Sequence, residues 1–121
     1  MTIRVTRATY ERLAGVRLPR GKREPNKWET RYAAEILHPR FLAGESVGYW
    51  FESMRLKIGE GAWYKTDWLE ILANGSVIIH EVKGHMREAA RVRLLAIRDK
   101  YKLPMRLARL VKGQWVVEEL A

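Results

Sequence analysis

The chain has no cysteine among its 121 residues, which excludes a disulfide framework and a thiolate metal site. No apolar run approaches the length of a membrane-spanning helix, and the N-terminus lacks the apolar core of a signal peptide. The sequence also has no P-loop, no dinucleotide-binding glycine motif and no Ser/His/Asp pattern. We therefore expect a soluble, cytoplasmic protein without a membrane partner, built on a single core.

Acidic residues are scarce: 14 Asp and Glu stand against 23 Lys and Arg, giving a net charge of +9. Residues 1–40 carry ten bases and four acids, and residues 83–112 carry ten bases and two acids. Residues 41–82 instead carry three bases and six acids. In a small protein that is merely basic overall, acidic and basic residues would not be expected to separate into different segments in this way. A basic frame around an acidic centre is typical of a protein that holds a polyanion, so we expect a nucleic-acid partner.

The segment 64–84, YKTDWLEILANGSVIIHEVKG, predicts a β-hairpin. A three-residue loop ending at Gly75 suits a type I turn whose last residue is left-handed. In that register Leu69 faces Ile79, and one face of the hairpin carries alternating apolar side chains. A two-residue turn would scatter this apolar set over both faces.

The same register places Asp67 opposite Glu81, with Lys83 beside them at the end of the apolar face. Two carboxylates about 5 Å apart repel each other unless a cation lies between them. Oxygen ligands suit Mg²⁺, and Mn²⁺ is expected to substitute for it. Lys83 could then orient or deprotonate a water, or stabilise charge on a phosphodiester. The alternative is a solvated, salt-bridged strand end, but ordinary strands place no charge on their core face.

A helix is predicted from Asn26 to a point before Pro39, because Asn26 and Glu29 form a capping-box pattern. The predicted buried stripe consists of Trp28, Tyr32, Ala33, Ile36 and Leu37. Glu29 has two interpretations. Its carboxylate either only caps the helix or reaches the acidic site from a helix packed on the sheet.

The remaining pattern predicts a strand over 47–58, a helix over about 87–102, and strands at 105–111 and 115–120. The expected order is thus helix, three strands, helix and two strands. This order predicts an α/β fold with a mixed central sheet flanked by helices.

Basic residues flank the acidic centre in two places. The charged, Gly- and Pro-containing residues 1–25 form an N-terminal arm that either lies along a phosphate backbone or is a disordered leader. A basic stripe on the second helix is either a solvated face or a phosphate contact, for which Arg91 is the preferred candidate. The candidate nucleic-acid contacts are Arg20, Lys22, Arg23, Lys27, Arg87 and Arg91.

The three histidines, His38, His80 and His85, do not form a metal set. His38 is expected at a helix end, and His80 points away from the face that carries the acids. His85 follows Gly84 closely enough to touch the site, although a lone loop histidine is usually only exposed.

The order helix acid, Asp, hairpin, Glu-x-Lys, helix, strand resembles the PD-(D/E)XK nuclease superfamily. The segments KWETRYA, YKTDW and EVKG are similar to the corresponding motifs of short phage and prophage endonucleases. The order of the acidic residues is similar to that in phage junction-resolving endonucleases. The resemblance covers residues 26–111, with Thr66 in place of the usual proline. It implies a restriction-endonuclease-like core in a nuclease domain over 26–121, encoded by a phage or prophage.

Residue by residue, the resemblance implies metal ligation by Asp67, Glu81 and the Val82 carbonyl. It makes Lys83 the catalytic lysine and Glu29 the helix acid. The expected function is a Mg²⁺-dependent DNA endonuclease, possible substrates including branched DNA such as a Holliday junction, which would require a homodimer. The alternatives are a non-catalytic nucleic-acid-binding module and an assembly protein that uses its sheet edge or its aromatics.

Overall fold

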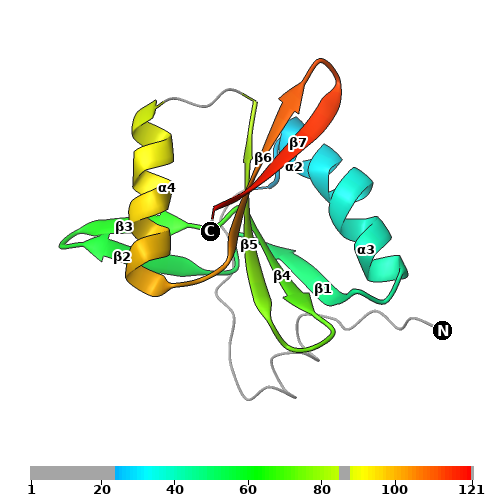
Figure 1. Ribbon diagram of the computed structural model, residues 1–121, viewed down its shortest axis with the longest axis horizontal. Helices are drawn as coiled ribbons and strands as arrows, with labels where there is room; N and C mark the ends of the chain where they lie inside the picture. Colours follow the sequence, from blue (N-terminus) through cyan, green and yellow to red (C-terminus); the bar gives the residue numbers. More distant parts are fainter. Residues whose placement is uncertain (1–23, 85–87, 121) are drawn as a thin grey trace.

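The computed structural model describes residues 24–84 and 88–120, which form an α/β structure (Figure 1). The first helical segment consists of α2 (Lys27–Tyr32), the π-helical turn η1 (Ala33–Leu37) and α3 (His38–Leu42). Five strands follow: β1 (Ser46–Phe51), β2 (Arg55–Gly59), β3 (Ala62–Lys65), β4 (Trp68–Leu72) and β5 (Val77–Lys83). The chain then forms α4 (Glu88–Tyr101), β6 (Met105–Val111) and β7 (Gln114–Leu120).

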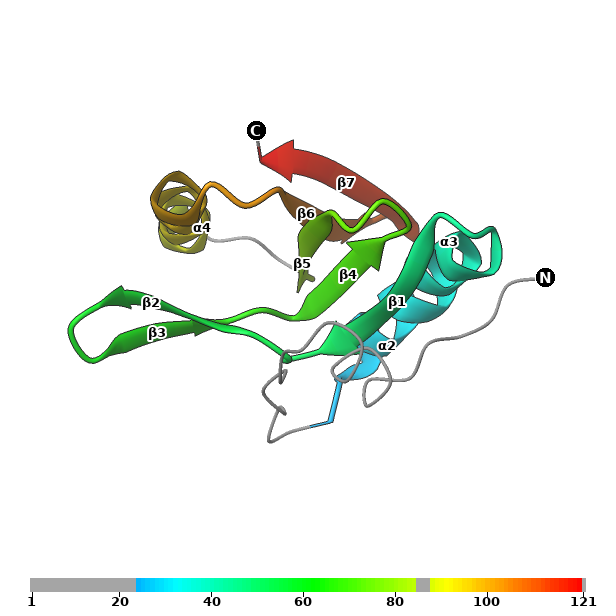
Figure 2. The same ribbon diagram turned by 90° about the horizontal axis from the view of Figure 1, so that it is seen from below.

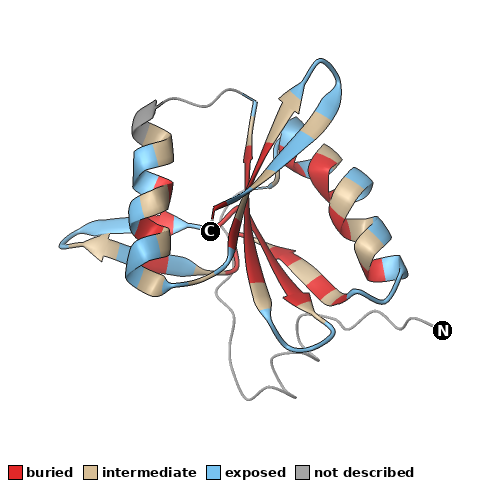
Figure 3. Cartoon of the chain, viewed as in Figure 1, coloured by how far each residue is buried: buried red, intermediate tan, exposed pale blue. Residues whose placement is uncertain are grey.

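The main sheet has five strands in the order β1-β4-β5-β6-β7, and its β5–β6 pair is parallel while the other pairs are antiparallel. The expected mixed sheet is therefore present. Helix α4 covers one face of the sheet, and the α2–α3 segment covers the other (Figures 1 and 2). The buried residues concentrate where the helices meet the central strands (Figure 3).

The predicted hairpin register is confirmed. Leu69 pairs with Ile79, and the Leu72 N–H donates to the Ser76 carbonyl at 2.8 Å. Gly75 has φ +89°, the left-handed conformation that the turn requires. Leu69 and Ile79 are both buried against α4.

The prediction of one strand over 47–58 is wrong. The run breaks after Phe51, because buried Glu52 adopts φ 46° and its N–H donates to the Asp67 carbonyl at 2.9 Å. The chain leaves the main sheet there, and β2 pairs with β3 in a separate two-stranded hairpin. Five strands, not three, therefore stand between the helical segments. The β2–β3 hairpin extends away from the main sheet on the side of α4 (Figure 2).

The first helix does not end before Pro39. A π-helical turn precedes the proline, with the His38 N–H bonded to the Ala33 carbonyl, and α3 restarts with Pro39 in its first turn. A proline is tolerated there, because its missing N–H needs no intrahelical partner. Trp28, predicted in the buried stripe, is instead 36% exposed, with the Lys27 ammonium 4.8 Å from its ring centroid.

The predicted second helix and the last two strands are present as α4, β6 and β7. No helix in the described part of the chain is both long enough and apolar enough to cross a membrane. Most of the N-terminal arm, with Arg20, Lys22 and Arg23, lies outside the described residues, as do His85 and Arg87.

Candidate functional site

Two buried carboxyl groups lie at the end of the β4–β5 hairpin. Asp67 directly precedes β4 and is 7% exposed, and Glu81 belongs to β5 and is 5% exposed. They occupy the positions just beyond the last ladder pair, Trp68 with His80, on the face that carries Leu69. One oxygen of Asp67 (Oδ2) accepts the Val82 N–H at 2.9 Å, which bridges the ends of the two strands.

Burial raises the pKa of the Asp67 carboxyl to about 8, and the negative charges of Glu81 and Glu29 add to this rise. Burial also raises the pKa of Glu81, although hydrogen bonds from Tyr64 and Lys83 oppose the increase. Both acids therefore hold protons more tightly than usual. Such a pair is a favourable place for a cation, which would relieve the repulsion that now raises both pKa values.

Glu29 both caps its helix and reaches the site. Its Oε1 accepts the Asn26 N–H at 2.9 Å, and its own N–H donates to Asn26 Oδ1 at 2.9 Å, so the predicted capping box is present. A hydrogen bond between the carboxyl groups of Glu29 and Asp67 also raises the pKa of Asp67. Ionised carboxylates only accept, so this bond requires a proton on one of the two groups. From the sequence, Glu29 either caps the helix or reaches the acidic site. In the structure it does both.

Lys83 lies at the edge of the site. Its ammonium is 3.1 Å from Glu81 Oε1, and its side chain is 36% exposed while that of Glu81 is buried. A cleft of about 230 Å³ opens beside it. The residues that line this cleft are Tyr64, Lys65, Glu81, Lys83, Ala90, Arg93 and Leu94.

The sequence alone does not assign Tyr64 or Arg93 to the site. Tyr64 is buried and donates a hydrogen bond to Glu81 Oε2. Arg93 donates to the Trp63 carbonyl at 3.1 Å. Both depend on how the β2–β3 hairpin packs on α4, and no local pattern in the sequence signals that packing. Tyr64 falls within the segment predicted as one hairpin, whereas its strand actually pairs with β2.

Of the candidate phosphate contacts, Lys27 and Arg91 lie among the described residues. Arg91 forms a two-pronged ion pair with Glu118 of β7, with one N–O distance of 2.8 Å. Lys27 is at the start of α2, near Glu29 in the sequence. Arg91 therefore already neutralises a carboxylate, and an arriving phosphate would have to compete with Glu118 for it.

The oxygen atoms available to a metal are few. Within residues 24–84 and 88–120, no group of three or more His, Cys, Asp or Glu side chains is arranged to hold a metal ion. The N–H and C=O of a residue in an extended strand point to the same edge, so the Val82 carbonyl faces the Asp67 side. Asp67, Glu81 and this carbonyl form a donor set that fits Mg²⁺, which uses one or two carboxylates and keeps several waters.

His80 lies on the opposite face of the sheet, as expected, and holds a buried network together there. Its Nδ1 is 2.7 Å from the Tyr32 hydroxyl and its Nε2 is 3.0 Å from Glu70 Oε1. Glu70, fully buried, also accepts from Arg40 Nε at 2.8 Å. This buried network ties β4 and β5 to α2 and α3. It thereby supports the helix that carries Glu29.

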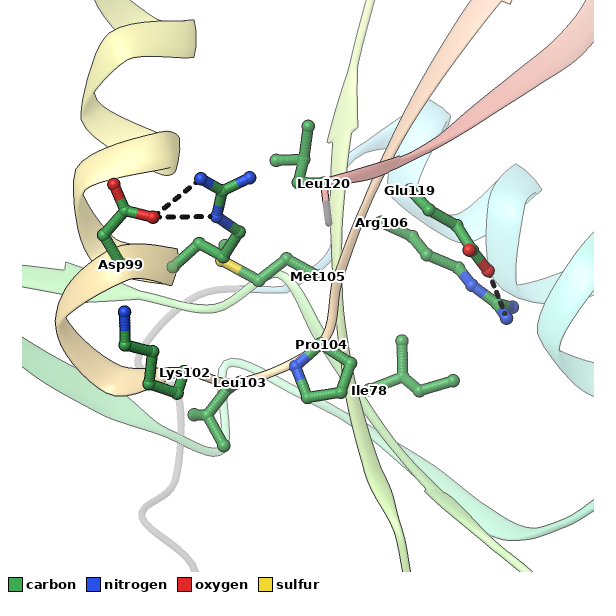
Figure 4. A pocket seen from close by; sticks show the side chains of 10 residues that line it. Ile78, Asp99, Lys102, Leu103, Pro104, Met105, Arg106, Glu119 and Leu120 are labelled. Carbon is green, nitrogen blue, oxygen red and sulfur yellow. Dashed lines mark hydrogen bonds and ion pairs between the residues drawn. The ribbon is translucent and has the colours of Figure 1, made fainter.

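A second hollow lies away from these carboxylates. It has a volume of about 500 Å³ and is formed between the end of α4 and the starts of β5 and β6 (Figure 4). Its floor includes Ile78, Met105 and Leu120, which are buried. The arginines at its rim are already paired, Arg98 with Asp99 and Arg106 with Glu119. We therefore place the candidate chemistry in the smaller cleft, beside the two acids whose pKa values are raised.

No protein-family model, curated protein or solved structure matches this chain.

Proposed function

We propose that the protein is a Mg²⁺-dependent DNA endonuclease that uses Asp67, Glu81 and Lys83. The observation that carries the proposal is the buried pair of carboxyl groups with raised pKa values, beside a partly exposed lysine that faces a cleft. Perturbed acids in a cleft are typical of functional sites. The net charge of +9 supports a polyanionic substrate.

Within this proposal, Asp67, Glu81 and the Val82 carbonyl would hold the cation. The chemistry that Mg²⁺ supplies when bound at such a site is neutralisation of charge at the phosphodiester and a lowered pKa of water. Its positive charge would also offset the negative charges of Glu81 and Glu29 that raise the pKa of Asp67.

Lys83 would act on the substrate from the edge of the cleft. Its ammonium contacts Glu81 yet remains exposed enough to reach a phosphate oxygen or a water in the cleft. There it would orient the water or stabilise the charge that develops on phosphorus. Glu29 would act through Asp67, since the contact between these two residues joins carboxyl to carboxyl.

Cleavage of a labelled four-way junction beside the matching linear duplex tests the proposal. Each substrate is incubated with Mg²⁺, Mn²⁺ or EDTA, using wild type, Glu81→Gln and Lys83→Ala. We expect metal-dependent cutting that both substitutions abolish while DNA binding persists. Cutting of the junction alone would identify a junction-resolving enzyme, whose paired cuts require a homodimer.

A non-catalytic nucleic-acid-binding module is the second candidate. The net charge of +9 favours it, because basic charge can hold a polyanion without any metal. Such a module would bind DNA equally well in EDTA and would not cut with any metal. Tight binding with no cleavage by freshly purified protein would therefore replace the nuclease proposal with this one.

A further inference from the structure

The β2–β3 hairpin has one face against the protein and one face that no described element covers. Its inner residues Leu56 and Tyr64 are buried with Leu94 and Ile97 of α4. The outer face consists of the exposed residues Arg55, Lys57, Trp63 and Lys65. We call these four residues the hairpin outer face.

Hydrogen bonds from α4 fix the position of the hairpin. A two-stranded hairpin alone is at best marginally stable, so its position depends on α4. Lys100 Nζ donates to the Lys57 and Ile58 carbonyls at 3.0 and 3.2 Å, and the Tyr101 hydroxyl also donates to the Lys57 carbonyl. The Arg93 guanidinium donates a hydrogen bond to the Trp63 carbonyl. These bonds use the backbone and leave the outer side chains available.

The outer face carries an unfavourable arrangement of charge. Arg55 and Lys65 are direct cross-strand partners, and like charges in such pairs are destabilising. Neither forms an ion pair with a described residue, and Lys57 has only the exposed Glu60 at 3.4 Å. The face therefore favours an anionic occupant. Residues 1–23 of the chain carry seven Lys or Arg and one acid, so they do not complement it, nor does a second copy of net charge +9.

Trp63 indicates which anion fits. Its side chain is 46% exposed, with the Arg55 guanidinium 5.0 Å and the Lys57 ammonium 6.0 Å from the ring centroid. An aromatic ring among cations matches a nucleic-acid strand, whose bases stack on the ring while its phosphates contact the cations beside it. In a paired duplex the base faces are already stacked, so only unpaired nucleotides present a free face to Trp63.

The outer face is continuous with the candidate site. Lys65 belongs to both the hairpin outer face and the cleft beside Lys83, and the neighbouring Tyr64 contacts Glu81. We infer that the hairpin outer face binds a single-stranded segment of DNA, with an unpaired base stacked on Trp63, next to the cleft. The inference rests on the proposed function and deepens it, because it names DNA with unpaired nucleotides as the substrate class.

Binding in EDTA tests the inference without cleavage. Fluorescence anisotropy with labelled oligothymidylate, and separately with a fully paired duplex, is measured for wild type and Trp63→Ala at one salt concentration. We expect Trp63→Ala to weaken oligothymidylate binding by about tenfold, with little change for the duplex. Trp63→Phe retains a stacking surface and should keep most of the affinity. Val116→Ala, which truncates a side chain of β7 that is 43% exposed, is the matched control and should change neither.

A pair of charge substitutions completes the design. Lys57→Gln should weaken oligothymidylate binding and its salt dependence, whereas Lys112→Gln at the β6–β7 turn makes the same charge change away from the hairpin and should have less effect. Thermal melting of each variant verifies that it is folded. If Trp63→Ala binds oligothymidylate as tightly as wild type, or loses both ligands equally, the inference is overturned. It is also overturned if wild type binds neither ligand.

Failure of this inference is distinguishable from failure of the nuclease proposal. Selective loss of single-strand binding in Trp63→Ala, with no cutting by wild type in any metal, would keep the hairpin surface and remove the nuclease. Metal-dependent cutting, together with unchanged single-strand binding by Trp63→Ala, would do the reverse.

Discussion

The Tyr64 hydroxyl donates a hydrogen bond to Glu81 Oε2, and this contact joins the β2–β3 hairpin to the candidate site. The bond lowers the pKa of Glu81 against the stronger effect of burial, which raises it. Tyr64 is itself buried, and its own pKa is raised by burial and by the charge of Glu81, so it stays a donor at neutral pH. The hairpin thus contributes directly to the ionisation of the carboxylate.

Tyr64→Phe should therefore shift the pH dependence of cleavage. Without the hydroxyl donor the pKa of Glu81 rises further, so the acid limb of the pH–rate profile moves to higher pH. At neutral pH we expect a loss of up to about tenfold in rate, recovered in part at higher pH. Cleavage rates measured across pH for the two proteins give the result. An unchanged profile would mean that Glu81 does not have to be ionised.

Asp67→Asn should abolish cleavage but stabilise the metal-free protein. The pKa of Asp67 is about 8 in the folded protein, against an ordinary value of 3.8, so the folded state binds the proton more tightly than the unfolded state does. The stability that this provides is complete below the ordinary value of 3.8 and is lost as pH rises through about 8. An asparagine keeps an acceptor for the Val82 N–H without the charge.

At pH 8 in EDTA we expect Asp67→Asn to gain on the order of 1 kcal/mol in the free energy of unfolding. At about pH 4, near the ordinary pKa of an aspartate, the gain should disappear. Urea denaturation of both proteins at the two pH values measures this difference in the free energy of unfolding. A variant that is less stable than wild type at pH 8 would contradict the assigned direction of the pKa shift.

Mg²⁺ should raise the melting temperature of wild type at pH 8. A ligand that binds only the folded state, at about one hundred times its dissociation constant, stabilises by about 2.7 kcal/mol. Asp67→Asn and Glu81→Gln should lose most of this response, because each removes a charged ligand. Differential scanning fluorimetry with a Mg²⁺ series and an EDTA baseline provides the comparison. Glu45→Gln, an exposed acid beyond α3, is a matched control that should respond like wild type.

Glu70→Ala should destabilise the fold strongly, because it leaves buried His80 and the partly exposed Arg40 without their shared carboxylate. Loss of one partner of a buried charged network costs about 3–5 kcal/mol. Burial raises the pKa of Glu70, but its hydrogen bonds with His80 and Arg40 outweigh that effect and lower it overall. Its contribution is thus present above the ordinary value of 4.5 and is lost as pH falls below it.

Urea denaturation of Glu70→Ala and wild type at neutral and acidic pH measures this difference. The gap between them should narrow in acid. Glu35→Ala removes an exposed acid of the same helical segment that carries Arg40, and it should cost far less. If the two variants lose the same free energy of unfolding, the buried network contributes no more to stability than an exposed ion pair does.

Local chemistry determined several features that the structure reproduces. A left-handed glycine and strict alternation fix a hairpin register, so Leu69 opposite Ile79 follows from Gly75 and the pleat alone. The capping box of Asn26 and Glu29 follows from residue spacing within one helical turn. These signals act over a few residues. The sequence therefore also predicts that Asp67, Glu81 and Lys83 lie on one face at the end of the hairpin.

Only the tertiary structure decided how distant segments meet. The strand over 47–58 breaks at Glu52 because the chain pairs with Asp67 there, and the helix continues through Pro39 because a π turn precedes it. Tyr64 reaches Glu81 only because the second hairpin packs on α4. Periodicity reports which face of an element is apolar, but it does not report which other element covers that face. The effect of Glu29 on the pKa of Asp67, and the uncovered surface around Trp63, depend on that long-range packing.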